Sequence, residues 1–210
     1  MTGTPLTELL SIAGPSIGAA DPEVREIAEL ELRSVLTERN GFYAFDSALH
    51  VFPTGWAGDE VSIEQWNAPA LWCDAYGDMT DGLLFFAEDA FGVQFALHQG
   101  AVVTFDPESG ETESVARSLE GWASAVLEDF DVLTGFRLAH EWQCTFGRIP
   151  ARQRLVPKVP FVVGGEFQLS NLYLSDAMTA MRFRGELAAK MRDLPDGTRV
   201  RFRTSSPDPE

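Results

Sequence analysis

Short runs rich in apolar residues, separated by turn residues, fill the middle of the chain from Gly82 to Trp122. Runs of this length bounded by Gly, Pro and Asp are typical of antiparallel strands joined by hairpins. The predicted strands and turns, in order, are 83–87, an interruption at Glu88-Asp89, 93–97 after Gly92, 102–105 after Gly100, the turn 106–110, and 112–116. Ser118 is then a suitable N-cap for a helix through Trp122 to about residue 130. This segment therefore predicts a meander of strands followed by a helix.

The residues before this meander alternate between helical and extended patterns. The first 20 residues are rich in Thr, Gly, Pro and Ala and predict a loosely ordered arm. Asp21-Pro22 then provides an N-cap and a first-turn proline for an amphipathic helix that ends near Asn40-Gly41. The sequence at 42–52 alternates large apolar with small or polar residues, which indicates one or two short strands, and 62–67 and 71–76 are expected to be short helical turns.

A helix is predicted at 136–145, at the end of the acidic part of the chain, and a basic, proline-rich extended segment follows it. After that segment, two further extended segments are expected at 161–163 and 167–174, and Ser175-Asp176 is expected to begin another helix. A last strand is predicted at 198–202, with arginines 199, 201 and 203 on one face.

The charge of the chain is strongly negative and unevenly distributed. The sequence has 16 Lys plus Arg against 32 Asp plus Glu, a net charge of −16. Residues 1–150 hold six basic and 25 acidic residues, whereas residues 151–210 hold ten basic and seven acidic. Such acidity opposes direct binding to nucleic-acid phosphates and to anionic membranes. It suits a basic protein partner, although the same charge also serves solubility.

The cysteines and the N-terminal sequence indicate a cytoplasmic protein. Cys73 and Cys144 are far apart and form no CxxC motif, so we expect reduced, buried thiols. The first ten residues lack a basic segment followed by an apolar core, and no apolar run approaches the ~20 residues that span a bilayer. We therefore expect neither a secretory signal nor a membrane span.

The segment LFFAEDAFGVQF, at 84–95, resembles the central motif of the SUKH superfamily, which includes fungal cell-wall synthesis regulators and many bacterial immunity proteins. Further residues and short motifs occur in the same order as in that family: Trp66-Asn67, Trp72, Tyr76, the Asp106 to Gly110 turn with Glu111, and SLEGW at 118–122. The resemblance covers about 40–129. The segment 155–172 is similar to the C-terminal extension of actinobacterial members and of immunity proteins paired with type VI secretion effectors.

This resemblance implies an α+β fold in which a mainly antiparallel or mixed sheet is flanked by helices. We accordingly divide the chain into an N-terminal arm at 1–20, a SUKH-like acidic main domain at 21–147, a smaller C-terminal α/β extension packed on it at 148–204, and a disordered tail at 205–210. Bacterial members bind and neutralise toxins, often nucleases or deaminases, by direct contact. The family pattern implies no catalytic residue and no cofactor. The expected partner is therefore a basic toxin domain, bound by a monomer or homodimer.

The candidate partner-binding residues are carboxylates in predicted loops and at the strand interruption: Asp46, Asp59, Glu60, Asp74, Glu88 and Asp89. If they converge, they form an acidic surface able to cover a basic groove. Each has a simpler interpretation. The loop carboxylates can be scattered solubility charges, and Glu88-Asp89 can be a turn whose oxygens accept backbone amides beside Gly92.

Catalytic and metal sites find little support in the residue pattern. His50, His98 and His140 are isolated, and no pair of histidines has the spacing of a metal site. Cys144 follows His140 by four residues, which places both on one helical face. The sequence therefore favours a non-enzymatic immunity protein. The alternatives are an intracellular scaffold or regulator of the same fold, and an enzyme that uses His140, Glu141 or Glu166.

Overall fold

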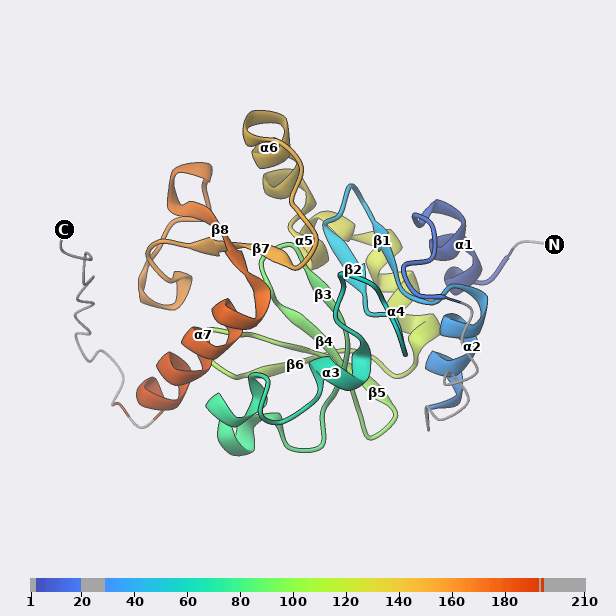
Figure 1. Cartoon of the computed structure of the whole chain (residues 1–210), viewed down its shortest axis with the longest axis horizontal. Coiled ribbons are helices and arrows are strands. Elements are labelled where there is room, and N and C mark those ends of the chain that lie inside the picture. The colour runs from blue at the N-terminus through green and yellow to red at the C-terminus, as the bar shows by residue number, and fades with distance from the viewer. Residues whose placement is uncertain (1–2, 20–28, 193, 195–210) are drawn as a thin grey trace.

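A six-stranded antiparallel sheet forms the centre of the molecule in the computed structural model, which describes residues 3–19, 29–192 and 194 (Figure 1). Its strand order follows the chain, so every strand pairs with its neighbour in sequence. The strands are β1 (Phe42–Ala44), β2 (Leu49–Val51), β3 (Leu84–Asp89), β4 (Gln94–His98), β5 (Ala101–Phe105) and β6 (Thr112–Ala116). A second sheet pairs β7 (Gln153–Pro157) with β8 (Leu172–Asp176). The predicted α+β class with a mainly antiparallel sheet is confirmed.

Helices cover this framework on several sides. The α-helices are α1 (Pro5–Ile12), α2 (Leu30–Glu38), α3 (Ile63–Trp66), α4 (Leu119–Glu128), α5 (Phe130–Thr134), α6 (Phe136–Phe146) and α7 (Ala177–Met191). Short 3-10 turns are η2 (Cys73–Ala75), η3 (Gly77–Thr80), η4 (Phe161–Val163) and η5 (Leu169–Asn171). In the view of Figure 1, α1 and α2 lie at one end of the molecule, whereas α7 and the β7–β8 pair lie towards the other.

The meander between Gly82 and Trp122 folds much as its pattern predicts. The Ser118 hydroxyl accepts the Gly121 amide at 3.1 Å and so caps α4. One difference concerns Glu88 and Asp89, which continue β3 instead of interrupting it. They remain in the strand because β2 pairs along them, with His50 opposite Glu88 and Leu49 opposite Asp89.

The prediction of a loosely ordered arm is wrong for residues 5–12, which form helix α1. Thr4 caps this helix through the Thr7 amide, and Pro5 occupies its first turn. Leu9 is completely buried and Leu10 is 4% exposed, and both belong to the main core. The apolar residues of α1 therefore provide the packing energy that the Thr, Gly and Pro content of the arm conceals.

The C-terminal extension contacts the main sheet through backbone and side chains. The Leu155 amide donates to the Ala90 carbonyl at 2.8 Å, which joins β7 to the end of β3. Helix α7 packs on η2 so closely that a Cβ added at Gly185 would lie 2.7 Å from the Tyr76 ring. Residues 161–163 form the 3-10 turn η4, so the extended segment predicted there is wrong.

Several sequence predictions fall outside the described residues. The first part of the helix expected after Asp21-Pro22 lies at 20–28, and only its later turns are described, as α2. The strand expected at 198–202, its three arginines and the tail at 205–210 also lie outside the described residues.

Candidate functional site

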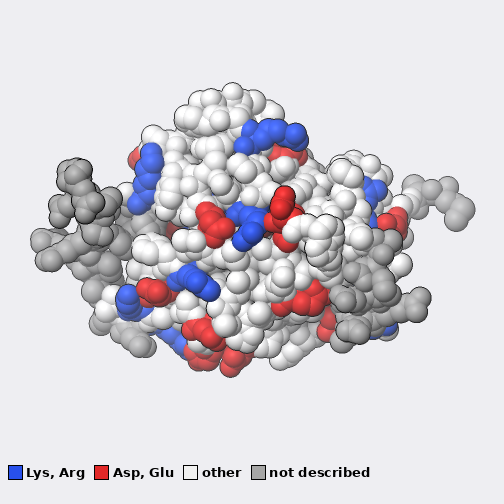
Figure 2. Space-filling model, in the orientation of Figure 1, with Lys and Arg blue, Asp and Glu red and all other residues white. Residues whose placement is uncertain are grey.

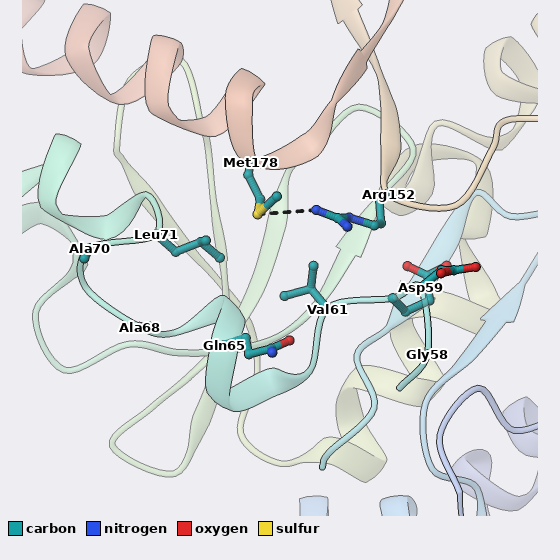
Figure 3. A pocket seen from close by; sticks show the side chains of 10 residues that line it. Gly58, Asp59, Val61, Gln65, Ala68, Ala70, Leu71, Arg152 and Met178 are labelled. Carbon is teal, nitrogen blue, oxygen red and sulfur yellow. Dashed lines mark hydrogen bonds between the residues drawn. The ribbon is translucent and has the colours of Figure 1, made fainter. Parts of the chain in front are cut away.

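A surface hollow of about 530 Å³ lies between the loop before α3, the segment after α3, and the start of the C-terminal extension (Figure 3). It is lined by Gly58, Asp59, Glu60, Val61, Gln65, Ala68, Ala70, Leu71, Arg152 and Met178. Val61, Leu71 and Met178 give it an apolar wall, and two carboxylates lie at one side. It therefore combines apolar contact area with a few polar groups, as protein and ligand sites do.

Asp59 and Glu60 project from a tight turn in which the Glu60 amide donates to the Ala57 carbonyl at 3.1 Å. The Glu60 carboxylate accepts the Tyr43 hydroxyl at 2.7 Å. Within the described part of the chain, neither carboxylate forms an ion pair with a lysine, arginine or histidine. Of the six predicted residues, only the sequence neighbours Asp59 and Glu60 thus line this hollow.

Glu88, predicted to contact a partner, is instead buried, with 2% of its surface exposed. Arg154 of β7 forms an ion pair with its Oε1, and Gln94 donates to its Oε2 at 3.2 Å. Gln94 in turn accepts the Trp66 indole N–H at 2.8 Å. Burial alone would raise the pKa of Glu88, but Arg154 and its other partners hold the pKa below its usual value. The prediction of a surface role is therefore wrong, because this carboxylate is the counter-charge for a buried arginine.

His50 belongs to the same buried cluster and stacks on Tyr43 with ring centroids 4.4 Å apart. Its Nδ1 lies 2.6 Å from Arg154 Nη2 and 3.1 Å from Glu88 Oε1. The same ring nitrogen therefore faces both a donor, the Arg154 guanidinium, and an acceptor, the Glu88 carboxylate. Burial lowers the pKa of His50, against the opposing influence of Glu88. The cluster therefore joins β2, β3 and β7 through one ionised pair and one neutral imidazole.

Asp89 is also buried and makes the local turn that the sequence left as the alternative. Its Oδ1 accepts the amides of Phe91 and Val93, each at 2.8 Å. Gly92 completes the turn with φ +85°, a conformation that favours glycine. Asp89 is 6% exposed, so the prediction that it contacts a partner is wrong.

Replacing Asp89 with asparagine should change how stability depends on pH. Burial raises the pKa of Asp89 to about 7 against the two amide hydrogen bonds. A carboxyl with a raised native pKa stabilises the fold at low pH, and this contribution is lost as pH rises through the native pKa. We expect the free energy of unfolding of the wild type to fall relative to Asp89→Asn between about pH 4, near the pKa of an unfolded aspartate, and about pH 7, the native pKa. Urea denaturation at several pH values measures this, and parallel pH profiles would contradict it.

Asp46 and Asp74 are exposed but lie at other places. Asp46 lies in the β1–β2 turn, where its Oδ2 is 3.0 Å from His140 Nδ1 of α6. Asp74 lies in η2 and lines a different hollow, together with Asp81. Figure 2 shows one face of the molecule, on which acidic side chains form separate small groups with basic side chains between them. On this face the carboxylates therefore do not merge into one acidic patch.

His140 and Cys144 share a helical face, as their spacing predicts. Cys144 Sγ lies 3.5 Å from His140 Nε2, and Asp46 contacts the other ring nitrogen. Cys73 is buried, but Cys144 is exposed, so the expectation of two buried thiols is wrong for Cys144. Within residues 3–19, 29–192 and 194, no three His, Cys, Asp or Glu side chains are arranged to hold a metal ion.

Sequence reasoning missed the residues that the hollow takes from the C-terminal extension. The guanidinium of Arg152 reaches over the hollow and lies 4.0 Å from the sulfur of Met178 (Figure 3). Arg152 has φ +61°, and its carbonyl accepts the Ala177 amide at 2.8 Å. No local pattern could have predicted these contacts, because they depend on how the extension returns to the loop before α3.

No described helix is long and apolar enough to cross a membrane.

Comparison with known proteins establishes similarity of fold alone. No protein-family model matches the chain, and no curated protein matches it significantly. The crystal structure of Atu4351 from Agrobacterium tumefaciens has a similar fold, with a TM-score of 0.59 and 13% sequence identity. The match covers 84% of this chain and 86% of that chain. The architecture described above is therefore shared with a solved structure across most of both chains.

Proposed function

We propose that this protein is a non-enzymatic immunity protein of the SUKH type, which binds a bacterial toxin and neutralises it by covering the toxin's functional surface. The resemblance of residues 84–95 to the central SUKH motif supports this proposal. These residues form β3, the Asp89 turn and the start of β4. In this proposal the motif supplies the framework, and the loops around it supply specificity.

The observation that carries the proposal is the rim of the 530 Å³ hollow, where Asp59 and Glu60 lie beside apolar side chains. Neither carboxylate has a cation partner among the residues described. This rim lies within residues 1–150, which carry 25 acidic and six basic residues. An exposed carboxylate without an ion-pair partner, here Asp59, beside an apolar wall suits a basic protein surface better than nucleic acid or an anionic membrane.

The proposed mechanism is occlusion guided by charge. The negative potential of the acidic part attracts a basic toxin domain and raises the association rate, which decreases as salt screens the charges. Once the toxin is bound, the hollow and its rim cover the part of the toxin surface that the toxin's substrate would otherwise contact. Toxins that act on nucleic acids need a basic groove for phosphate binding, so a nuclease or deaminase domain is the expected partner.

Co-expression with the products of the genes on either side of this one, each tested first for toxicity on its own, tests the proposal. We expect cells that produce both proteins to grow, cells that produce the toxin alone to arrest, and the two proteins to co-purify. Absence of both protection and a complex would overturn the proposal. A pull-down that instead yields a housekeeping protein, with no toxicity from adjacent genes, would favour the scaffold alternative.

A further inference from the structure

Trp56 is an exposed tryptophan in a protein whose other tryptophans are buried. It is 77% exposed, whereas Trp66, Trp72 and Trp122 are each 1% exposed and Trp142 is 7% exposed. Its ring stacks on no other ring among the described residues. An exposed tryptophan contributes no core packing, and tryptophans are enriched among the residues that dominate binding at interfaces.

The loop that carries Trp56 is anchored at both ends. Asn40 exchanges two hydrogen bonds with the backbone of Thr54, at 2.8 and 3.0 Å. The Glu64 carboxylate accepts the Thr54 hydroxyl and the Gly55 amide. At the other end, the 57–60 turn is closed by the Glu60 amide, and Ala57 is buried. A loop anchored in this way loses little conformational entropy when a partner binds.

The Trp56 indole lies against Gly58, one of the residues that line the hollow. A Cβ built on Gly58, which has φ +64°, would lie 3.8 Å from the Trp56 ring. Asp59 follows Gly58 directly and also lines the hollow. Figure 3 shows that the Arg152 guanidinium points towards Met178 and away from Asp59, so it leaves this carboxylate open.

We propose that Trp56 and Asp59 form a clamp for an arginine side chain of the protein partner, and that the apolar wall beside them receives a neighbouring apolar side chain. This inference rests on the proposed function for the existence of a protein partner. A guanidinium stacks on an indole face and makes paired hydrogen bonds with a carboxylate, so the two residues together favour arginine. Val61, Leu71 and Met178 offer the apolar contact next to it.

Two blocked tripeptides, acetyl-Leu-Arg-Leu-amide and acetyl-Leu-Glu-Leu-amide, test the clamp on the full chain. The readout is the indole N–H resonance of Trp56, assigned by its loss in Trp56→Leu. We expect the arginine peptide to shift this resonance saturably at millimolar concentrations, less so at high salt, and the glutamate peptide to leave it unchanged. Asp59→Asn should lower the affinity for the arginine peptide roughly threefold to tenfold, as expected for loss of a charge-assisted contact. Asp81→Asn, which changes a carboxylate at another hollow, should leave the affinity for the arginine peptide unchanged. Equal responses to the two peptides, or an unchanged affinity in Asp59→Asn, would overturn the clamp.

A toxic product of a neighbouring gene, identified by the co-expression test, separates this inference from the proposed function. If the wild type protects cells, the Trp56→Leu/Asp59→Asn double variant should bind the toxin at least tenfold more weakly, as loss of a central contact does. Full protection and unchanged toxin affinity in that double variant would overturn the clamp and leave the immunity function standing. If the wild type forms no complex with the toxin, the immunity proposal fails, and the tripeptide result alone decides whether the clamp binds arginine.

Discussion

Glu88→Ala should lower the free energy of unfolding by about 3–5 kcal/mol, and Arg154→Ala by a similar amount, because each leaves the other charge buried without its counter-charge. The side chains of both residues are almost completely buried, at 2% and 3% exposed. Removing Glu88 also deprives Gln94 of an acceptor, and removing Arg154 removes the contact of its guanidinium with His50 Nδ1. Urea denaturation followed by circular dichroism at neutral pH measures both changes.

Two controls separate the buried charge from the loss of side-chain volume. The double variant Glu88→Leu/Arg154→Met should recover most of the lost stability, since replacing a whole buried ion pair with apolar residues is often neutral. Lys190→Ala, which removes an exposed ion pair with Glu186, should change stability by less than about 0.5 kcal/mol. A loss below about 1 kcal/mol in both single variants would contradict the assignment of this pair as a buried connection between sheet and extension.

Leu9→Ala should lower the free energy of unfolding by about 2–5 kcal/mol, the usual range for a leucine removed from a packed core. Leu9 is completely buried in the main cluster, and the amide of Leu6, about one turn earlier in α1, donates to Glu120 of α4 at 3.1 Å. Ile12, at the end of the same helix, is 51% exposed and provides the matched control. Thermal and urea unfolding of Leu9→Ala and Ile12→Ala should therefore differ strongly. Equal, small losses would mean that α1 does not belong to the core.

The elements predicted most accurately are those that depend on local patterns. Alternation and turn residues located the strands of the meander, because hairpin turns need Gly, Pro or Asp at defined positions. Ser118 and Asp176 each accept a backbone amide of the helix that follows, as N-cap residues do. Helix α1 was missed because its turn-forming composition hides a short apolar face, which becomes stable only against α4.

The candidate site was harder to predict from the sequence, since the burial of a side chain depends on residues that are distant in the chain. Asp59 and Glu60 were identified correctly as loop carboxylates at the surface. Glu88 was placed at the surface because its partner Arg154 is 66 residues away and belongs to the C-terminal extension. The neighbouring Asp89 shows the opposite case, since its amide partners at Phe91 and Val93 are local and were considered as an alternative.

The uneven distribution of charge along the chain is explained in part by ion pairs between the basic extension and the acidic part. Arg154 of the basic extension neutralises Glu88 inside the protein, and Arg192 pairs with Asp78 at its surface. Arg184, also from the extension, is buried and donates to the Phe91 carbonyl at 2.7 Å. Part of the acidic excess is therefore neutralised within the protein by arginines of the extension. The carboxylates that remain available to a partner are those on exposed loops, and among them Asp59 lies beside the apolar wall of the hollow.

Calorimetric titration of this protein with a toxic product of a neighbouring gene, combined with an assay of the toxin's own activity, tests the central claim most directly. The immunity proposal predicts saturable binding that weakens as salt is raised, and loss of toxin activity at equimolar protein. Absence of binding heat together with undiminished toxin activity at excess protein would contradict it.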